Sequence, residues 1–135
     1  MNRNLLVLSA TLIMGTAAKA QSAVAVFKPL YSGDEHYGFA TGSTESSAKQ
    51  KSLSELALAV DSKVASGTQG QRYIYKSTSK KGGYAVGRGR DQYGHYWHYE
   101  AALGYDSEEA AQKYVLSRLA GRGLSDAEIL SSGVD

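Results

Sequence analysis

Residues 40–53, ATGSTESSAKQKSL, and residues 102–115, ALGYDSEEAAQKYV, carry the same pattern 62 positions apart. The identical positions are Ala40/Ala102, Gly42/Gly104, Ala48/Ala110, Gln50/Gln112 and Lys51/Lys113. Each stretch combines the end of a strand, a polar segment with helix-capping residues, and the start of a helix. Two copies are too few for a solenoid, which needs about three repeats. The sequence therefore predicts one domain with two related halves.

The first half predicts a hairpin followed by a helix. Apolar residues 23–28 and residues 36–41 flank a Ser-Gly-Asp turn, which is typical of two paired strands. Thr44 is suited to cap the helix that follows. The residues expected on the buried face of this helix are Leu53, Leu56, Ala57 and Val60.

The second half predicts three strands and a helix. Residues 72–77 and 84–90 flank Lys80-Lys81-Gly82-Gly83, a connection typical of a hairpin, and a third strand is expected over residues 95–103. A helix is expected to begin at Asp106, with Ala111, Val115 and Leu119 facing the core. The acidic, capping-type sequence of residues 125–128 predicts a short C-terminal helix ending near residue 130.

These elements give the order β-β-α-β-β-β-α, with the strands grouped as hairpins. That order predicts an α+β fold in which one antiparallel sheet of about five strands has both main helices on one face.

The first twenty residues predict a secretory signal peptide. Arg3 precedes an apolar run over residues 5–17, and residues 18–20 place alanines where a signal peptidase cuts. The run is shorter than the about 20 residues that a membrane-spanning helix needs. We therefore expect residues 21–135 to form a single exported domain, periplasmic or secreted, without stable membrane insertion.

The amino-acid composition excludes several kinds of chemistry and modification. The chain has no cysteine, which excludes disulfides, thiolate catalysis and cysteine-based metal sites. No asparagine follows residue 4, so there is no glycosylation sequon, and this favours a bacterial envelope or secreted protein. Without Arg3 and Lys19 the chain has 13 basic and 13 acidic residues. Export and neutrality together argue against a nucleic-acid partner.

The apolar strand at residues 23–25, the sequence Tyr37-Gly38-Phe39-Ala40-Thr41-Gly42 and the alanine-containing helix after it resemble a family of small secreted bacterial domains of unknown function. In that family, Tyr-Gly-rich strands and alanine-rich helices occur in tandem. The resemblance implies a fold and a compartment, and it brings no catalytic residues. This chain departs from the family pattern because it has no cysteines near its helix ends.

Aromatic and basic residues are concentrated between residues 72 and 99. Tyrosine rings beside guanidinium groups suit recognition of a protein or a sugar, because a ring supplies contact area at low entropic cost. The binding candidates are Arg88, Arg90, Tyr96, His98 and Glu100. We therefore predict an exported, non-enzymatic binding module for an unknown protein or an anionic glycan, with an inhibitor or immunity-type envelope protein as the form to test first.

Two alternatives stay open. His98 and Glu100 fall on one face of a strand, and a titrating pair of this kind is what general acid–base catalysis needs, so a small periplasmic hydrolase or metal-dependent enzyme centred on them is one alternative. A surface or structural assembly protein that pairs through its Gly/Tyr-rich strands is the other. The chain contains no known catalytic motif, so we assign no catalytic residue, metal ligand or cofactor.

Overall fold

The computed structural model describes residues 21–135, so the expected signal peptide lies outside the described residues. Over this range the chain runs β-β-α-β twice. The elements are β1 (Gln21–Pro29), β2 (His36–Gly42), α2 (Glu45–Lys63), β3 (Gly70–Thr78), β4 (Gly83–Arg90), β5 (Trp97–Tyr105), α3 (Glu108–Gly121) and β6 (Ser125–Val134). No helix among these elements has the length and apolar character needed to cross a membrane.

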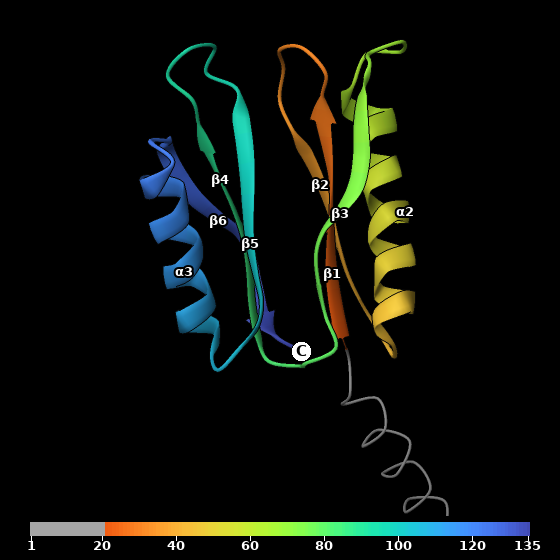
Figure 1. Cartoon of the computed structure of the whole chain (residues 1–135), viewed down its shortest axis with the longest axis vertical. Coiled ribbons are helices and arrows are strands. Elements are labelled where there is room, and N and C mark those ends of the chain that lie inside the picture. Colours follow the sequence, from red (N-terminus) through yellow and green to blue (C-terminus); the bar gives the residue numbers. More distant parts are fainter. Residues whose placement is uncertain (1–20) are drawn as a thin grey trace, which may run out of the picture.

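The strands form two antiparallel sheets that pack against each other. The first sheet has the order β2-β1-β3 and the second has the order β5-β4-β6. Figure 1 shows four layers, with α2 on the outside of the first sheet and α3 on the outside of the second. The predicted α+β class is confirmed. The predicted single sheet with both helices on one face is wrong, because each half builds its own sheet and covers it with its own helix.

β1 is the central strand of the first sheet and is covered on both faces. Residues 23–27, Ala-Val-Ala-Val-Phe, are all at most 4% exposed. Ala25 and Phe27 pack against α2, whereas Val24 and Val26 face the second sheet. This is why β1 is a continuous apolar run and does not alternate with polar residues.

Serine and threonine side chains cap both helices. The Thr44 side-chain oxygen accepts the Ser47 N–H at 3.0 Å, as expected, whereas α3 is capped by Ser107 and not by Asp106. The buried residues of α3, Ala111, Val115 and Leu119, are those predicted. In α2 the buried residues are Ala48, Ser52, Leu56 and Val60, so the prediction was wrong for Leu53, which is 38% exposed, and Ala57 is only half-buried.

The internal repeat is present in the structure with one change of register. Ala23 lies opposite Ala40 in the first sheet and Ala85 lies opposite Ala102 in the second, so the strands repeat at 62 residues. β5 then contains an extra residue where its register with β4 shifts, and Gly104 there has a φ of +70°, which favours glycine. Beyond that bulge the helices repeat at 63 residues, as their caps and buried positions show.

Two further expectations were wrong. Residues 79–82 do not close a hairpin, because β3 belongs to the first sheet and β4 to the second. Residues 125–134 form β6 and not a short helix, because this segment pairs with β4. The tertiary pairing overrides a local helix-capping sequence.

Aromatic rings join the two halves in the core between the sheets. The ring centres of Tyr37 in β2 and Tyr99 in β5 lie 5.0 Å apart. Phe39 stacks on Tyr84 of β4 with 4.5 Å between the ring centres. Tyr37 and Tyr99 are 62 positions apart, so this contact is made by matching positions of the two copies. The aromatic cluster of the sequence is therefore partly core.

Candidate functional site

The hairpins of the two halves turn back at the same end of the molecule, which we call the tip end (Figure 1). It consists of the β1–β2 loop, residues 30–35, and the β4–β5 loop, residues 91–96. Each loop carries an exposed tyrosine at the matching position of the repeat: Tyr31 is 85% exposed and Tyr93 is 90% exposed. Leu30, beside Tyr31, is 58% exposed. The tip end thus presents large apolar groups that make no contribution to the core.

Hydrogen bonds hold both loops in place. The Asp34 carboxylate accepts the N–H of Trp97 at 2.8 Å, and the Glu35 N–H donates to the carbonyl of Trp97 at 3.0 Å. In the other loop the Asp91 carboxylate accepts the Gly94 N–H at 2.9 Å. Loops that are ordered before binding lose less conformational entropy when a partner binds.

His98 connects the two loops through its imidazole ring. Its Nδ1 lies 3.0 Å from Glu35 Oε2, and its Nε2 lies 2.7 Å from Asp91 Oδ2. Glu35 is only 7% exposed and also accepts the N–H of Tyr99. Only the doubly protonated imidazolium can donate an N–H to both carboxylates. The bridge joins the first half to the second at the base of the tip end.

Asp91 makes the stability of this bridge depend on pH. Its hydrogen bond with His98, aided by the Gly94 N–H, lowers the pKa of Asp91 from 3.8 to about 2. A carboxylate whose pKa is lower in the folded state stabilises the fold above pH about 4, and this contribution is lost as the pH falls toward 2. We expect Asp91→Asn to reduce the loss of stability between pH 4 and 2 in acid unfolding followed by circular dichroism. An unchanged acid profile in Asp91→Asn would contradict this role for the bridge.

A cavity of about 450 Å³ lies beside the β1–β2 loop, and we call it the tip pocket. Its walls come from the loop, from the C-terminal end of α2 at Lys63, and from Arg88 and Trp97 of the second sheet. His36 also lines it, and burial lowers the pKa of this imidazole, with the charge of Lys63 acting in the same direction and Asp34 opposing it. The pocket combines aromatic walls with two cations, Lys63 and Arg88.

Arg88 and Arg90 both stack on Trp97. The guanidinium carbons lie 3.8 Å and 4.3 Å from the centre of the Trp97 ring. Arg88 also donates to Glu128 of β6 at 2.7 Å. The two arginines therefore have internal partners, and Arg88 contributes to the wall of the tip pocket.

Glu100 lies in a separate charged cluster. Its side chain is 1% exposed, Oε1 accepts the Tyr75 hydroxyl at 2.7 Å, and Lys76 lies 3.3 Å away. On the other side, Oε2 lies 3.6 Å from Arg122 and 3.8 Å from Arg118 of α3. Burial alone raises the pKa of Glu100, but the hydrogen bonds from Tyr75 and the Ala101 backbone, together with the charge of Lys76, lower it below its ordinary value.

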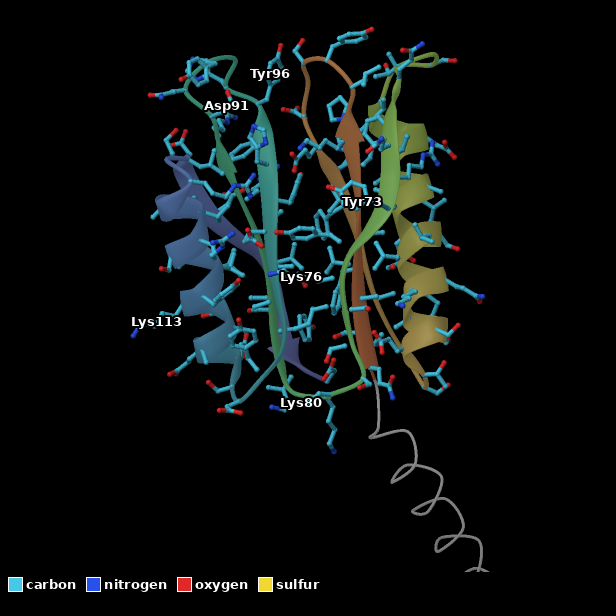
Figure 2. The ribbon with its side chains drawn as sticks, in the orientation of Figure 1. Tyr73, Lys76, Lys80, Asp91, Tyr96 and Lys113 are labelled. Carbon is cyan, nitrogen blue, oxygen red and sulfur yellow. The ribbon has the colours of Figure 1, made fainter. Side chains whose placement is uncertain are left out.

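The cations around Glu100 also cover the free edge of β5. Lys76 reaches from β3 to β5 and donates to the carbonyl of Ala101 at 2.7 Å (Figure 2). Arg122 donates to the carbonyl of Tyr99 at 3.2 Å. Because these contacts satisfy edge carbonyls and join β3 and α3 to β5, the cluster around Glu100 has a structural role.

The structure divides the sequence-predicted binding residues among several places. Arg88 and Arg90 lie opposite Tyr99 and Trp97 and so point between the sheets, whereas His98 and Glu100 point to the other face of β5. Tyr96 precedes β5 and lies at the tip end with Asp91 (Figure 2). His98 and Glu100 do lie on one face of the strand, but each has its own set of partners and no hydrogen bond joins them.

Sequence reasoning missed the residues that define the tip end. Tyr31 and Tyr93 are 62 positions apart, which was a usable signal, and so are His36 and His98. No signal in the sequence brings Glu35 to His98, because that contact joins residues 63 positions apart, one in the β1–β2 loop and the other in β5.

Over residues 21–135 no three histidine, aspartate or glutamate side chains are placed to hold a metal ion together. Glu35 and Asp91 approach opposite nitrogens of His98, so the three side chains do not converge on one point.

Comparison with known proteins gives no relative: no family model, no curated protein and no solved structure matches this chain.

Proposed function

We propose that this protein is an exported, non-enzymatic binding module that contacts its partner through the tip end. The observation that carries the proposal is the pair of matching loops, each with a tyrosine that is at least 85% exposed at the same position of the repeat. Exposing a large aromatic ring to water is unfavourable in free energy, and these two rings do not stabilise the core. Tyrosine is enriched where proteins bind one another.

The chemistry of the tip end favours a protein partner. The loop carboxylates of Asp34 and Asp91 are engaged within the molecule, and the exposed side chains of the two loops include the two phenol rings, Leu30, Gln92 and His95. The tip pocket beside them has room for one inserted side chain, with the exposed Lys63 to receive an acidic group. An anionic glycan is the second class of partner that this combination suits.

Export is the other part of the proposal. It rests on the apolar run and the alanines of residues 1–20. An inhibitor or immunity-type protein of the cell envelope is the form that fits a small binding domain with two rigid loops. Blocking an enzyme needs a preformed convex end and no chemistry of its own.

Capture from a bacterial envelope extract tests the binding end. The double variant Tyr31→Ser/Tyr93→Ser is expected to bind its partner at least about tenfold more weakly than the wild type, because truncating a tyrosine that is a hot spot of an interface costs about 2 kcal/mol or more. The matched control is Leu53→Ser/Leu116→Ser, which removes exposed apolar groups from α2 and α3. Protein recovered from the periplasmic fraction should begin at Gln21.

Two results would overturn the proposal. One is capture that the tip variant leaves unchanged, and the other is capture that is lost only in the helix variant. A full-length chain that stays in the cytoplasm would separately refute export.

A further inference from the structure

A small cavity lies between the two sheets, where the edge strands β3 and β5 approach each other, and we call it the inter-sheet cavity. Tyr73 and Tyr75 of β3 and Tyr99 of β5 line it. Tyr73 lies opposite Val26 of β1 and so shares the face of the first sheet that looks toward the second (Figure 2). The cavity has a volume of about 160 Å³. Pockets for drug-sized ligands measure about 300–1,000 Å³, so this one has room for a single small ring.

Charged groups of both signs line the inter-sheet cavity. The carboxylates are Glu35 and Glu100, and the cations are Lys28, Arg118 and Arg122. The Glu100 side chain is 1% exposed and that of Arg118 is 55% exposed, so the arginine lies toward the solvent side of the cavity. An anionic ligand would face two carboxylates, and a cationic ligand would face three cations. The charges of the cavity therefore favour a neutral ligand.

One carboxylate oxygen of Glu100 has no hydrogen-bond donor within the described part of the chain. Oε1 accepts the Tyr75 hydroxyl, whereas Oε2 is buried and no donor of residues 21–135 reaches it. The cationic nitrogens of Arg122 and Arg118 lie 3.6 and 3.8 Å from Oε2, which is beyond hydrogen-bond distance. Oε2 thus has counter-charges nearby and lacks a donor. Because buried polar atoms are almost always hydrogen-bonded, Oε2 is suited to a donor that a ligand brings.

A hydroxyl group is the donor that matches these surroundings. An ammonium group at Oε2 would lie close to the two guanidinium groups, which would repel it. A hydroxyl group is neutral, and it can donate to Oε2 while its own oxygen accepts from a guanidinium N–H. The tyrosine rings of the cavity suit the C–H groups of a compact ring, since the face of an aromatic ring carries partial negative charge.

We propose that the inter-sheet cavity binds one neutral sugar unit. A hydroxyl group of the sugar donates to Glu100 Oε2 and accepts from Arg118 or Arg122, and the sugar ring lies against Tyr73. The unit is a free monosaccharide or the end of a neutral glycan. The exposed tyrosines of the tip end do not line this cavity, so the sugar site is tested independently of the partner proposed for the tip end.

Titration of the purified wild-type protein with single sugars, followed by NMR of its backbone amides, tests the site. The neutral probes are glucose, galactose, mannose and N-acetylglucosamine, and the charged probes are glucuronate and the protonated form of glucosamine. At least one neutral sugar should shift the amide resonances of Tyr73, Tyr75 and Glu100 in a saturable way. The charged probes should bind at least about tenfold more weakly, because each brings like charges together in the cavity.

Two further series of sugars define the ligand. The sugar that binds is also offered as its methyl glycoside: equal binding of the two forms shows that the cavity takes the end of a glycan, and binding of the free form alone identifies a monosaccharide. Among the monodeoxy analogues of that sugar, one is expected to bind at least about tenfold more weakly, because it leaves Glu100 Oε2 without a donor.

Tyr73→Ala removes one aromatic wall of the cavity and is expected to weaken binding of the sugar at least about tenfold. The matched control Arg72→Ala truncates the exposed neighbouring residue, which points to the other face of β3, and should leave the Kd within about twofold. The proposal is wrong if no neutral sugar shifts the resonances of the cavity, if a charged probe binds more tightly than every neutral one, if every monodeoxy analogue binds as the parent sugar does, or if Tyr73→Ala binds like the wild type.

Discussion

Replacing Gly38 with alanine is expected to lower the free energy of unfolding by about 3 kcal/mol, because even one methyl group has no room there. A Cβ at this position overlaps backbone atoms of Ser52 and Leu56 in α2. Backbone cannot move aside as a flexible side chain does, so the helix must shift as a unit. Thermal unfolding should show a fall in Tm of roughly 10 °C.

Gly121→Ala is the matched control for Gly38→Ala. Gly121 is the last residue of α3, and an added Cβ there meets no atom within 4 Å. The control should be neutral or slightly stabilising, because alanine has less conformational freedom to lose on folding. Equal effects of the two substitutions would show that α2 does not rest on β2 in the way described.

Glu100→Gln is expected to destabilise the protein by about 2–4 kcal/mol, although the two side chains have nearly the same shape. The carboxylate is the shared counter-charge of Lys76, Arg118 and Arg122, and removing one partner of a buried ion network leaves the remaining charges uncompensated. The cations are partly exposed and can turn toward water, which limits the loss. Urea unfolding at neutral pH measures the difference.

Glu128→Gln makes the same chemical change in an ion pair at the surface. The side chains of Arg88 and Glu128 are 28% and 46% exposed, so this control should cost less than about 1 kcal/mol. If Glu100→Gln proved no more destabilising than Glu128→Gln, the cluster around Glu100 would not hold the two halves together.

Gly38→Ala and Glu100→Gln probe the same position of the repeat, because residues 38 and 100 are 62 apart. In the first half the position is glycine, and α2 lies against the strand. In the second half it is a buried glutamate, whose charge is met by α3 and by β3 of the other half. The two copies of the unit therefore differ. The first has a glycine at this position and an edge strand, β2, that is left free, whereas the second has a buried charge there and an edge strand, β5, that is covered.

The sequence predicted local structure better than its assembly. Five strands, both main helices and the Thr44 cap were predicted because apolar runs, turn residues and capping residues act over a few neighbours. The helix predicted at residues 125–128 was wrong, because their acids are typical of a helix start while β4 offers them a strand partner. The linker at residues 79–82 looks like a hairpin turn, and nothing local shows that it crosses between sheets.

The candidate site was harder to predict from the sequence than the local structure, for the same reason. Strand alternation placed His98 and Glu100 on one face, but their partners Glu35, Asp91 and Tyr75 come from other strands and loops. The exposure of Tyr31 and Tyr93 depends on how the hairpins turn back together, which composition and spacing do not give. The 62-residue repeat relates Tyr31 to Tyr93 and His36 to His98, and these pairs are the signals of the tip end that the sequence contains.

Site-specific photo-cross-linking in living cells tests the central claim most directly. A photoreactive phenylalanine analogue is placed at position 31 or 93 of the tip end, and at position 53 or 116, two exposed leucines of the helices, as controls. The account predicts that positions 31 and 93 give a cross-link to the same partner in the cell envelope and that positions 53 and 116 give none to it. Cross-links to that partner from the helix positions alone would contradict the account.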